Sequence, residues 1–435
     1  MMKRKTKHLI VISFDGLSTL DFEHINSLPN FKNFIDESSY CKKVYSVYPT
    51  LTYPAHATIV TGKYPKNHGI INNTLLQPGR ISPDWYWQRK YINGETIYDI
   101  AIDNGMTVAA LLWPVTGKSR IQYNMPEIFA NRPWQNQIMV SLLNGSPLFQ
   151  LKLNNKFGSL RDGIKQPNLD NFIHSSLLYT IEDKKPNITF VHYTDLDTTR
   201  HNYGFNSKEA NEAIKRHDRR LGDIIKTLKA NDMYEDSTII VLGDHSSLDE
   251  EKIINLNILL KENGYIQVDN NGKIIDYKVI AKHCDGSAYL YVNDKQNQKL
   301  IDEVRDLIED FNNKYKCIEA IYTSEEAKNL GADMNCALMF EANKGYYFLD
   351  NIEGEIIKKI QPHEVWELHG VTRSTHGYSP FKKDYTTVFI ASGCGIKKGV
   401  VIDKMNLIDE APTMAKILGL ELKNVDGRIV EEFLE

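Results

Sequence analysis

Cysteine is scarce in this sequence and follows no pairing pattern. The 435 residues contain five cysteines, which are odd in number, widely scattered and without a C-x-x-C pair. Disulfide scaffolds and thiolate zinc sites both rely on regularly or closely spaced cysteines. The sequence therefore suggests neither of them.

Long apolar runs are also missing. No stretch approaches the ~20 apolar residues that a membrane-spanning helix needs. The basic N-terminal residues imitate the start of a signal peptide, but the apolar run that follows them, residues 9–14, is too short and ends at Asp15. We therefore expect a cytoplasmic protein.

A large charge of one sign is absent too, since the net charge is −4. A chain of this charge has no general attraction to nucleic acid or to an anionic membrane. We therefore expect no stable nucleic-acid complex and no membrane partner. Phosphate recognition would have to be local, and metal ions are the natural way to supply it.

Short apolar runs that alternate with amphipathic segments fill most of the chain. The runs are β-rich and apolar on both faces, which is typical of buried parallel strands. Strands that alternate with helices predict an α/β fold, with a mostly parallel central sheet and helices on both faces. The predicted strands are residues 8–14, 44–48, 106–113, 188–193, 237–242 and 386–391. The predicted helices are residues 28–38, 54–61, 95–104, 170–182 with Asp170 as N-cap, 209–231, 256–263 and 410–418.

The pattern changes between residues 265 and 369. Alternating segments at 287–292 and 336–341 flank a charged helix at 299–312, which indicates a small α+β insertion. We therefore predict a core of residues 1–264 and 370–435, with residues 265–369 as a cap or insertion. In the core, residues 114–165 are expected to form loops and short helices. The aromatic loop 74–94, with Trp85-Tyr86-Trp87, is either a lid over the substrate or a loop packed on its own core.

The stretch from residue 46 to 73 organises the rest of the chain. It contains a hydroxyl at Thr52, an aromatic at Tyr53 and then Pro54, which suits the first turn of a helix. The N-terminus of a helix attracts anions, so a hydroxyl there could be a nucleophile that faces a phosphate or a sulfate. Threonine also caps helices. The stretch alone leaves both interpretations of Thr52 open.

Metal-type side chains stand next to several predicted strands. Carboxyl ends of parallel strands face the crevice where α/β proteins bind ligands. Residues 197 and 201 share one face if their segment is helical, whereas adjacent residues 244 and 245 point in opposite directions and could serve two neighbouring metals. Each of these side chains taken singly is as easily a solvated carboxylate or a core histidine. The set is Asp15, Asp197, His201, Asp244, His245 and His376.

Three aspartates and three histidines are mixed oxygen and nitrogen ligands that suit zinc, with manganese as the alternative. Two such ions about 4 Å apart can hold both the attacking and the leaving oxygen of a phosphoryl displacement. The sequence therefore predicts a site for two divalent metal ions beside Thr52.

Five motifs in this order resemble the nucleotide pyrophosphatase/phosphodiesterase branch of the alkaline phosphatase superfamily. The resemblance runs from Asp15 to D-E-A-P-T at 409–413, and it covers the core but not the insertion. The motifs are F-D-G at 14–16, T-L-T-Y-P-A-H-A-T-I-V-T-G-K-Y-P-K-N-H-G-I-I-N-N at 50–73, D-T-T-R-H at 197–201, G-D-H at 243–245 and T-H-G-Y at 375–378.

The resemblance implies a role for each matching position. Thr52 would be the nucleophile that forms a covalent ester, Asn73 would donate to a non-bridging phosphate oxygen, and Tyr53 would stack on a nucleotide base. One metal would be held by Asp197, His201 and His376, and the other by Asp15, Asp244, His245 and the Thr52 oxygen. The implied activity is hydrolysis of phosphodiester or phosphoanhydride bonds in nucleotide-type substrates.

Departures from the family pattern leave the ligands intact. Arg200 replaces a common glycine and adds a cation that would favour a more anionic substrate, Ala55 replaces a usual asparagine, and Ser-Asp-His-Gly becomes Gly-Asp-His-Ser at 243–246. A sulfatase is rejected, because its formylglycine is made from cysteine or serine and not from threonine. The alternatives are a phosphomonoesterase or phosphonate hydrolase of the same superfamily and, further away, a catalytically silent binding protein.

Overall fold

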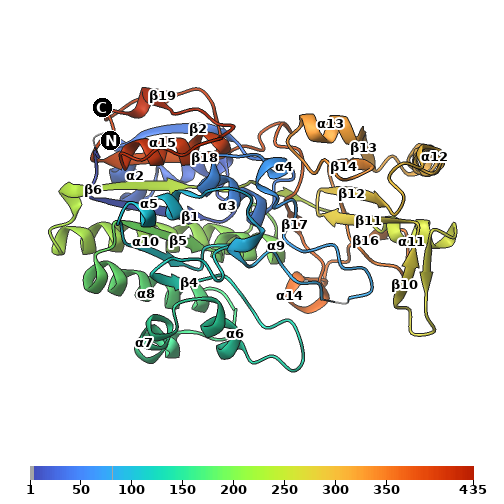
Figure 1. The fold of residues 1–435 in the computed structure, drawn as a ribbon, viewed down its shortest axis with the longest axis horizontal. Helices are drawn as coiled ribbons and strands as arrows, with labels where there is room; N and C mark the ends of the chain where they lie inside the picture. Colours follow the sequence, from blue (N-terminus) through green and yellow to red (C-terminus); the bar gives the residue numbers. More distant parts are fainter. Residues whose placement is uncertain (1–3, 81) are drawn as a thin grey trace.

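The computed structural model describes residues 4–80 and 82–435, and within them nine strands form one central sheet (Figure 1). The first three residues of the predicted core and residue 81 of the predicted aromatic loop lie outside the described residues. The strand order is β19-β2-β18-β6-β1-β5-β3-β4, and β20 pairs with β2. Their bounds are β1 His8–Phe14, β2 Ser39–Tyr45, β3 Val108–Leu111, β4 Tyr123–Met125, β5 Ile188–Tyr193, β6 Ser237–Leu242, β18 Thr387–Gly393, β19 Val401–Ile402 and β20 Met405–Asn406.

The sheet is mostly parallel, as predicted. Strand β1 pairs in parallel with β5 and β6, so that Ile12 lies opposite Val191 on one side and Val241 on the other. Strand β3 continues the parallel pairing from β5 to β4, whereas β18 is antiparallel to both of its neighbours, β6 and β2. The α/β fold predicted from the alternating pattern is confirmed.

Both faces of the sheet are covered by helices, because the buried strands are apolar on both sides. Alternate residues of β1 enter different cores: Leu9 and Val11 belong to one cluster, and Ile10 and Ile12 to the other. The first cluster lies under α3 Thr52–Thr61, α5 Ile97–Asp103 and α15 Glu410–Ile417. The second lies under α2 Pro29–Asp36, α8 Asn168–Lys184 and α10 Lys208–Ala230.

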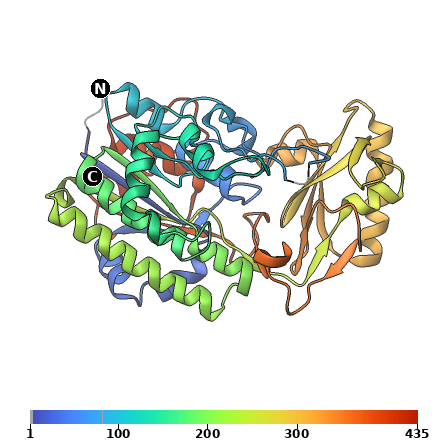
Figure 2. The same cartoon turned by 90° about the horizontal axis from the view of Figure 1, so that it is seen from below.

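A second sheet with its own core lies beside the central one (Figure 2). Its strand order is β11-β12-β14-β13, and Leu290 of β12 packs with Val304 and Ile308 of α12. Leu256 and Leu260 of α11, from just before the predicted insertion, join the same cluster. The boundaries at 265 and 369 therefore remain a prediction. The elements are α11 Leu256–Glu262, β11 Val279–Cys284, β12 Ser287–Val292, α12 Gln298–Tyr315, β13 Ile318–Thr323 and β14 Leu338–Ala342.

Two local predictions are wrong. The strand predicted at 44–48 is β2, which starts five residues earlier and ends at Tyr45, where the chain leaves the sheet toward α3. Asp170 does not cap α8, whose N-cap is Pro167. The buried carboxylate of Asp170 instead accepts hydrogen bonds from the backbone N–H groups of Thr194 and Asp195, each at 3.2 Å. Asp170 therefore stabilises the turn after β5.

The weakly patterned stretch 114–165 contains two helices beyond the edge strand β4, α6 Gln137–Asn144 and α7 Pro147–Phe157. Among the described residues, no helix is both long enough and apolar enough to span a bilayer.

Candidate active site

The sequence-predicted ligand set comes together at one edge of the central sheet. Asp15 directly follows β1, Asp244 follows β6 after one glycine, and α9 Asp195–Tyr203 follows β5. These three strands are parallel, so their carboxyl ends meet at the same edge. His376 lies in the segment before β18. Because β18 is antiparallel to β6, the segment before β18 lies at the same edge of the sheet as the carboxyl end of β6.

Two overlapping groups of ligand atoms form within this set. Asp197 and His201 are one helical turn apart on α9, with 3.1 Å between Oδ2 and Nε2, and the Nε2 of His376 lies 3.9 Å from Asp197 Oδ1. His245 Nε2 lies 3.2 Å from Asp15 Oδ1 and 3.3 Å from Asp244 Oδ2. In each of two sets of three residues, the ligand atoms, one per residue, all lie within 4.8 Å of one another. The sets are Asp197, His245 and His376, and Asp15, Asp244 and His245. His245 thus joins the two groups.

The carboxylates of this cluster are buried and incompletely satisfied. One oxygen each of Asp15, Asp197 and Asp244 has no hydrogen-bond partner among the described residues. Burial, followed by the charges of Asp244 and Asp197, raises the pKa of Asp15, and burial raises the pKa of Asp244 to about 6. Unpaired carboxylates in a dry site are costly unless a cation neutralises them. The donor set therefore fits divalent metal ions.

The imidazoles are oriented for the same purpose. His201 Nδ1 contacts the carbonyl of Ser374 at 2.8 Å, and His376 Nδ1 contacts the carbonyl of Thr50 at 3.1 Å. Such carbonyl contacts fix the ring so that Nε2 faces the ligand cluster. Burial lowers the pKa of His245 and of His376 to about 4, so both rings are neutral at pH 7, which is the form that binds metals.

The second sheet helps to hold His376. Gly286, in the turn between β11 and β12, donates its N–H to the His376 carbonyl at 2.8 Å. The next residue, Gly377, has φ +85°, and a Cβ there would lie 1.7 Å from the carbonyl oxygen of Cys284. Only glycine permits this approach of two backbones.

Thr52 faces this cluster from the start of α3. The helix begins at Thr52, two residues earlier than predicted, and its N-cap is Leu51. The Thr52 hydroxyl makes no capping hydrogen bond and lies 3.2 Å from His245 Nε2. The capping interpretation is therefore wrong, and the hydroxyl stands next to the joining residue of the two ligand groups.

Asn73 and Tyr53 have different environments. Asn73 Oδ1 accepts the backbone N–H of Tyr53 at 2.9 Å, which leaves its Nδ2 group available as a donor. The Tyr53 side chain is 0% exposed and packs with its ring edge-on to Trp85, 5.1 Å between centroids. Its cluster also contains Val115 and Ile128. The Tyr53 ring is enclosed by these neighbours, and the stacking of a base on it stays a prediction.

The aromatic loop 74–94 contributes to the same cluster. Trp85 and Trp87 both contact Phe129, with centroid distances of 5.3 and 5.4 Å. This geometry favours the packing interpretation of the loop over a lid.

Arg200 does not serve a substrate. It is 1% exposed, donates to the carbonyl of Gly16, and pairs with Asp21 at 2.6 Å. The expectation that it favours a more anionic substrate is therefore contradicted. Asp21 neutralises the charge, and burial leaves no path to a ligand.

A second layer of histidines supports the cluster, and sequence reasoning missed part of it. His192 Nε2 lies 3.1 Å from Asp15 Oδ2, and its Nδ1 lies 3.4 Å from a Glu127 oxygen. His56 contacts the Thr52 carbonyl at 2.8 Å through Nδ1. Nothing in the sequence distinguishes His192 from an ordinary core residue, since it lies within an apolar strand.

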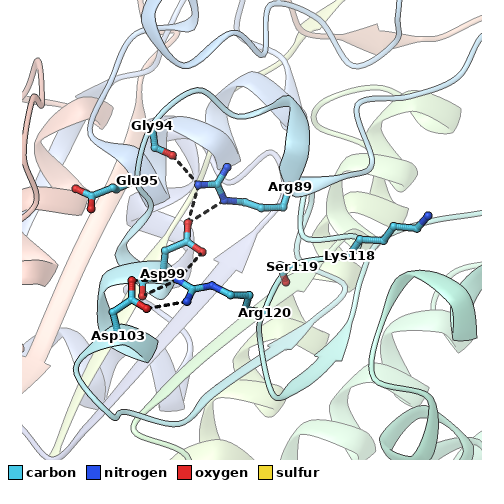
Figure 3. Close-up of a pocket in the computed structure, with 8 residues that line it drawn as sticks. All are labelled: Arg89, Gly94, Glu95, Asp99, Asp103, Lys118, Ser119 and Arg120. Carbon is cyan, nitrogen blue, oxygen red and sulfur yellow. Dashed lines mark hydrogen bonds and ion pairs between the residues drawn. The ribbon is translucent and has the colours of Figure 1, made fainter.

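A polar hollow of about 340 Å³ lies elsewhere, around the start of α5 (Figure 3). None of the six predicted ligands lines it. Arg89 pairs with Asp99 at 2.6 Å and Arg120 with Asp103 at 2.7 Å, so these cations are already neutralised. It is not the candidate active site.

An oxygen- and nitrogen-rich cluster beside a helix-start hydroxyl, on an alkaline phosphatase-like α/β fold, defines the class of hydrolases that cleave phosphate ester bonds. The family model described as "Type I phosphodiesterase / nucleotide pyrophosphatase" matches residues 9–379. The chain belongs to this family and is a hydrolase of phosphodiester or phosphoanhydride bonds.

Individual relatives have low sequence identity to this chain, but some of them match it over nearly its whole length. The bis(5'-adenosyl)-triphosphatase ENPP4 of Pongo abelii is 22% identical over 95% of this chain and 78% of its own length. Venom phosphodiesterase 2 of Crotalus adamanteus is 28% identical over 54% of this chain and 26% of its own. The solved structure of murine ENPP5 is 20% identical and superposes with a TM-score of 0.67 over 98% of this chain and all of that one.

Proposed function

We propose that Thr52 is the nucleophile of a two-metal phosphodiesterase. Asp197, His201 and His376 would hold one ion. The other would be held by Asp15, Asp244 and His245. The observation that carries the proposal is the Thr52 hydroxyl 3.2 Å from His245 Nε2, beside three buried carboxylate oxygens that accept no hydrogen bond from the described residues. Zinc suits this donor set best, and manganese is the alternative.

The bound ions would supply Lewis acidity, which lowers the pKa of the hydroxyl and stabilises negative charge on the phosphate. The Thr52 oxygen attacks phosphorus, the bond to the leaving oxygen breaks, and a covalent Thr52 ester remains. Water then cleaves this ester and restores the hydroxyl. Asn73 Nδ2 donates to a non-bridging oxygen as charge develops on it.

Nucleotide-type small molecules are the proposed substrates. The curated ENPP4 relatives are named for hydrolysis of bis(5'-adenosyl)-triphosphate, and murine ENPP5 has been solved, as an inactive variant, in complex with AMP. Phosphomonoesterase or phosphonate hydrolase activity is the second candidate. The cytoplasm is the proposed compartment, because all five cysteines are free thiols, as a reducing environment would keep them.

The covalent step is tested by rapid acid quenching during turnover of a nucleotide diester, followed by peptide mass spectrometry. The peptide that contains Thr52 is expected to gain the mass of a nucleotidyl group, and the same peptide from Thr52→Ala is not. Modification of a different residue, or of none at any quench time, would remove Thr52 from this role.

Asn73→Ala is expected to lower kcat on a diester by about 100-fold, the usual cost of one lost donor to a developing oxyanion. The matched variant Asn73→Asp keeps the oxygen that accepts the Tyr53 N–H but lacks the N–H₂ donor. It should be at least as impaired. Wild-type kcat in Asn73→Asp would mean that Asn73 only anchors the start of α3.

His192→Phe is expected to weaken zinc binding by about 10- to 100-fold, since a partner that orients a ligand carboxylate is typically worth this much. Zinc affinity is measured by competition with a chromogenic chelator. His174→Gln, which alters a contact with the Tyr193 hydroxyl instead, is the control. His192→Gln retains a side-chain N–H and should recover part of the affinity. Equal zinc affinity in His192→Phe and wild type would exclude a positioning role.

A further inference from the structure

The helices α6 and α7 carry apolar side chains that the fold does not use. Eight of the eighteen large apolar side chains that are exposed in the described part of the chain lie between residues 134 and 164. Trp134 is 80% exposed, Leu143 66% and Leu148 84%. Monomeric proteins rarely gather so many exposed apolar side chains without a partner surface.

Both helices bury one apolar face against the rest of the protein, and their exposed apolar side chains lie on a different face. On α6, Val140 packs against the aromatic cluster around Tyr53, while Ile138, Met139 and Leu143 point outward. On α7, Phe149 and Leu153 enter the main core. Leu148 and Leu151 of α7 are exposed. A surface helix normally presents charged or polar residues on its outward face, whereas α6 presents apolar ones there. Figure 1 shows the two helices together at the β4 edge of the sheet.

The surroundings of this surface are basic, although the whole chain carries a net charge of −4. Residues 137–165 contain four basic residues, among them Lys152 and Lys156, against a single acidic one. Lys152 and Lys156 are both exposed. A second copy of the chain would bring two basic surfaces together, which repel. Lys152 also pairs with Asp183 at 3.4 Å and Lys165 with Asp162 at 3.0 Å, both at exposed positions. Exposed tryptophan and leucine beside exposed basic side chains suit the interface of an anionic lipid bilayer.

We propose that the α6–α7 surface, defined by Trp134, Ile138, Met139, Leu143, Leu148 and Leu151, docks the enzyme on anionic phospholipid membranes. The apolar side chains enter the headgroup region while the lysines contact lipid phosphates. This docking is local and does not require the chain to cross the bilayer, and it departs from the expectation of no membrane partner, which rested on the net charge of the whole chain. It goes beyond the proposed function and does not depend on it.

The test is cosedimentation of the full chain with vesicles of phosphatidylcholine mixed with phosphatidylglycerol, and of phosphatidylcholine alone. Binding is expected only to the mixed vesicles and is expected to weaken with salt. Ile138→Ser/Leu143→Ser/Leu148→Ser should lower the partition coefficient by more than about tenfold, because three large apolar side chains leave the interface. Lys156→Glu should reduce binding to the mixed vesicles.

The matched control is Ile275→Ser/Phe381→Ser, which removes two equally exposed apolar side chains outside the surface. It should bind vesicles as wild type does. All variants should keep wild-type turnover of a water-soluble nucleotide diester, which shows that they fold. The proposal is overturned if the wild type does not sediment with mixed vesicles, or if the triple variant binds equally. It is also overturned if the wild type is a dimer that the triple variant dissociates, which would make the surface an interface between copies.

Discussion

Thr52→Ala is expected to lower kcat/KM on a nucleotide diester by at least about 10³-fold, which corresponds to roughly 4 kcal/mol of transition-state stabilisation. The hydroxyl at the start of α3 lies 3.2 Å from His245 Nε2 in the ligand cluster, and alanine offers no atom that can attack phosphorus. Steady-state rates with p-nitrophenyl thymidine monophosphate measure the effect.

The metal content of the same variant separates chemistry from folding. Thr52 is not one of the six proposed ligands. Thr52→Ala should therefore retain about the wild-type amount of zinc, as measured by elemental analysis. Thr58→Ala, which removes a hydroxyl that bonds the Lys63 carbonyl within the same helix region, is the matched control and should remain active. Near-wild-type activity in metal-loaded Thr52→Ala would contradict the nucleophile assignment.

Removal of the metals is expected to lower turnover by at least about 10³-fold, because both the activation of the hydroxyl and the charge stabilisation at phosphorus are then lost. Dialysis against a chelator followed by addition of zinc should restore activity, and about two ions per chain should bind. The apo protein should also melt at a lower temperature, since a ligand that binds only the folded state stabilises it.

Asp197→Asn is the specific variant for the metal prediction. It keeps the size of the side chain and removes the charge that lies 3.1 Å from His201 and 3.9 Å from His376. Loss of about one ion per chain and of activity is expected. Asp249→Asn serves as the control, because Asp249 is the exposed last residue of the short strand β7 Leu248–Asp249 and its carboxylate accepts the Phe205 N–H. Full activity of the chelator-treated enzyme without added metal would refute the two-metal account.

The fold and the ligand cluster could be predicted because they follow from local pattern. Apolar runs such as His8–Phe14 are short, β-rich and buried on both faces, and the carboxyl ends of parallel strands must meet. Asp15 and Asp244 follow directly from that geometry. His376 followed less directly, since it depends on β18, which is antiparallel.

The environment of Tyr53 could not be predicted in the same way. Its burial depends on Trp85, Val115 and Ile128, which are 32 to 75 positions away in the sequence, so no local pattern reveals it. Asp170 failed for a related reason: as the first charged residue of a helix it resembles a cap, but its carboxylate binds the turn after β5. His192 lies in an apolar strand, and only the fold brings it to Asp15.

The balance between diester and monoester hydrolysis tests the central claim most directly. Turnover of p-nitrophenyl thymidine monophosphate and of p-nitrophenyl phosphate is compared on the zinc-loaded enzyme under identical conditions. A site with one amide donor at Asn73, in which Arg200 is already paired with Asp21, should turn over the diester faster. Faster turnover of the monoester would contradict the account and make the protein a phosphomonoesterase.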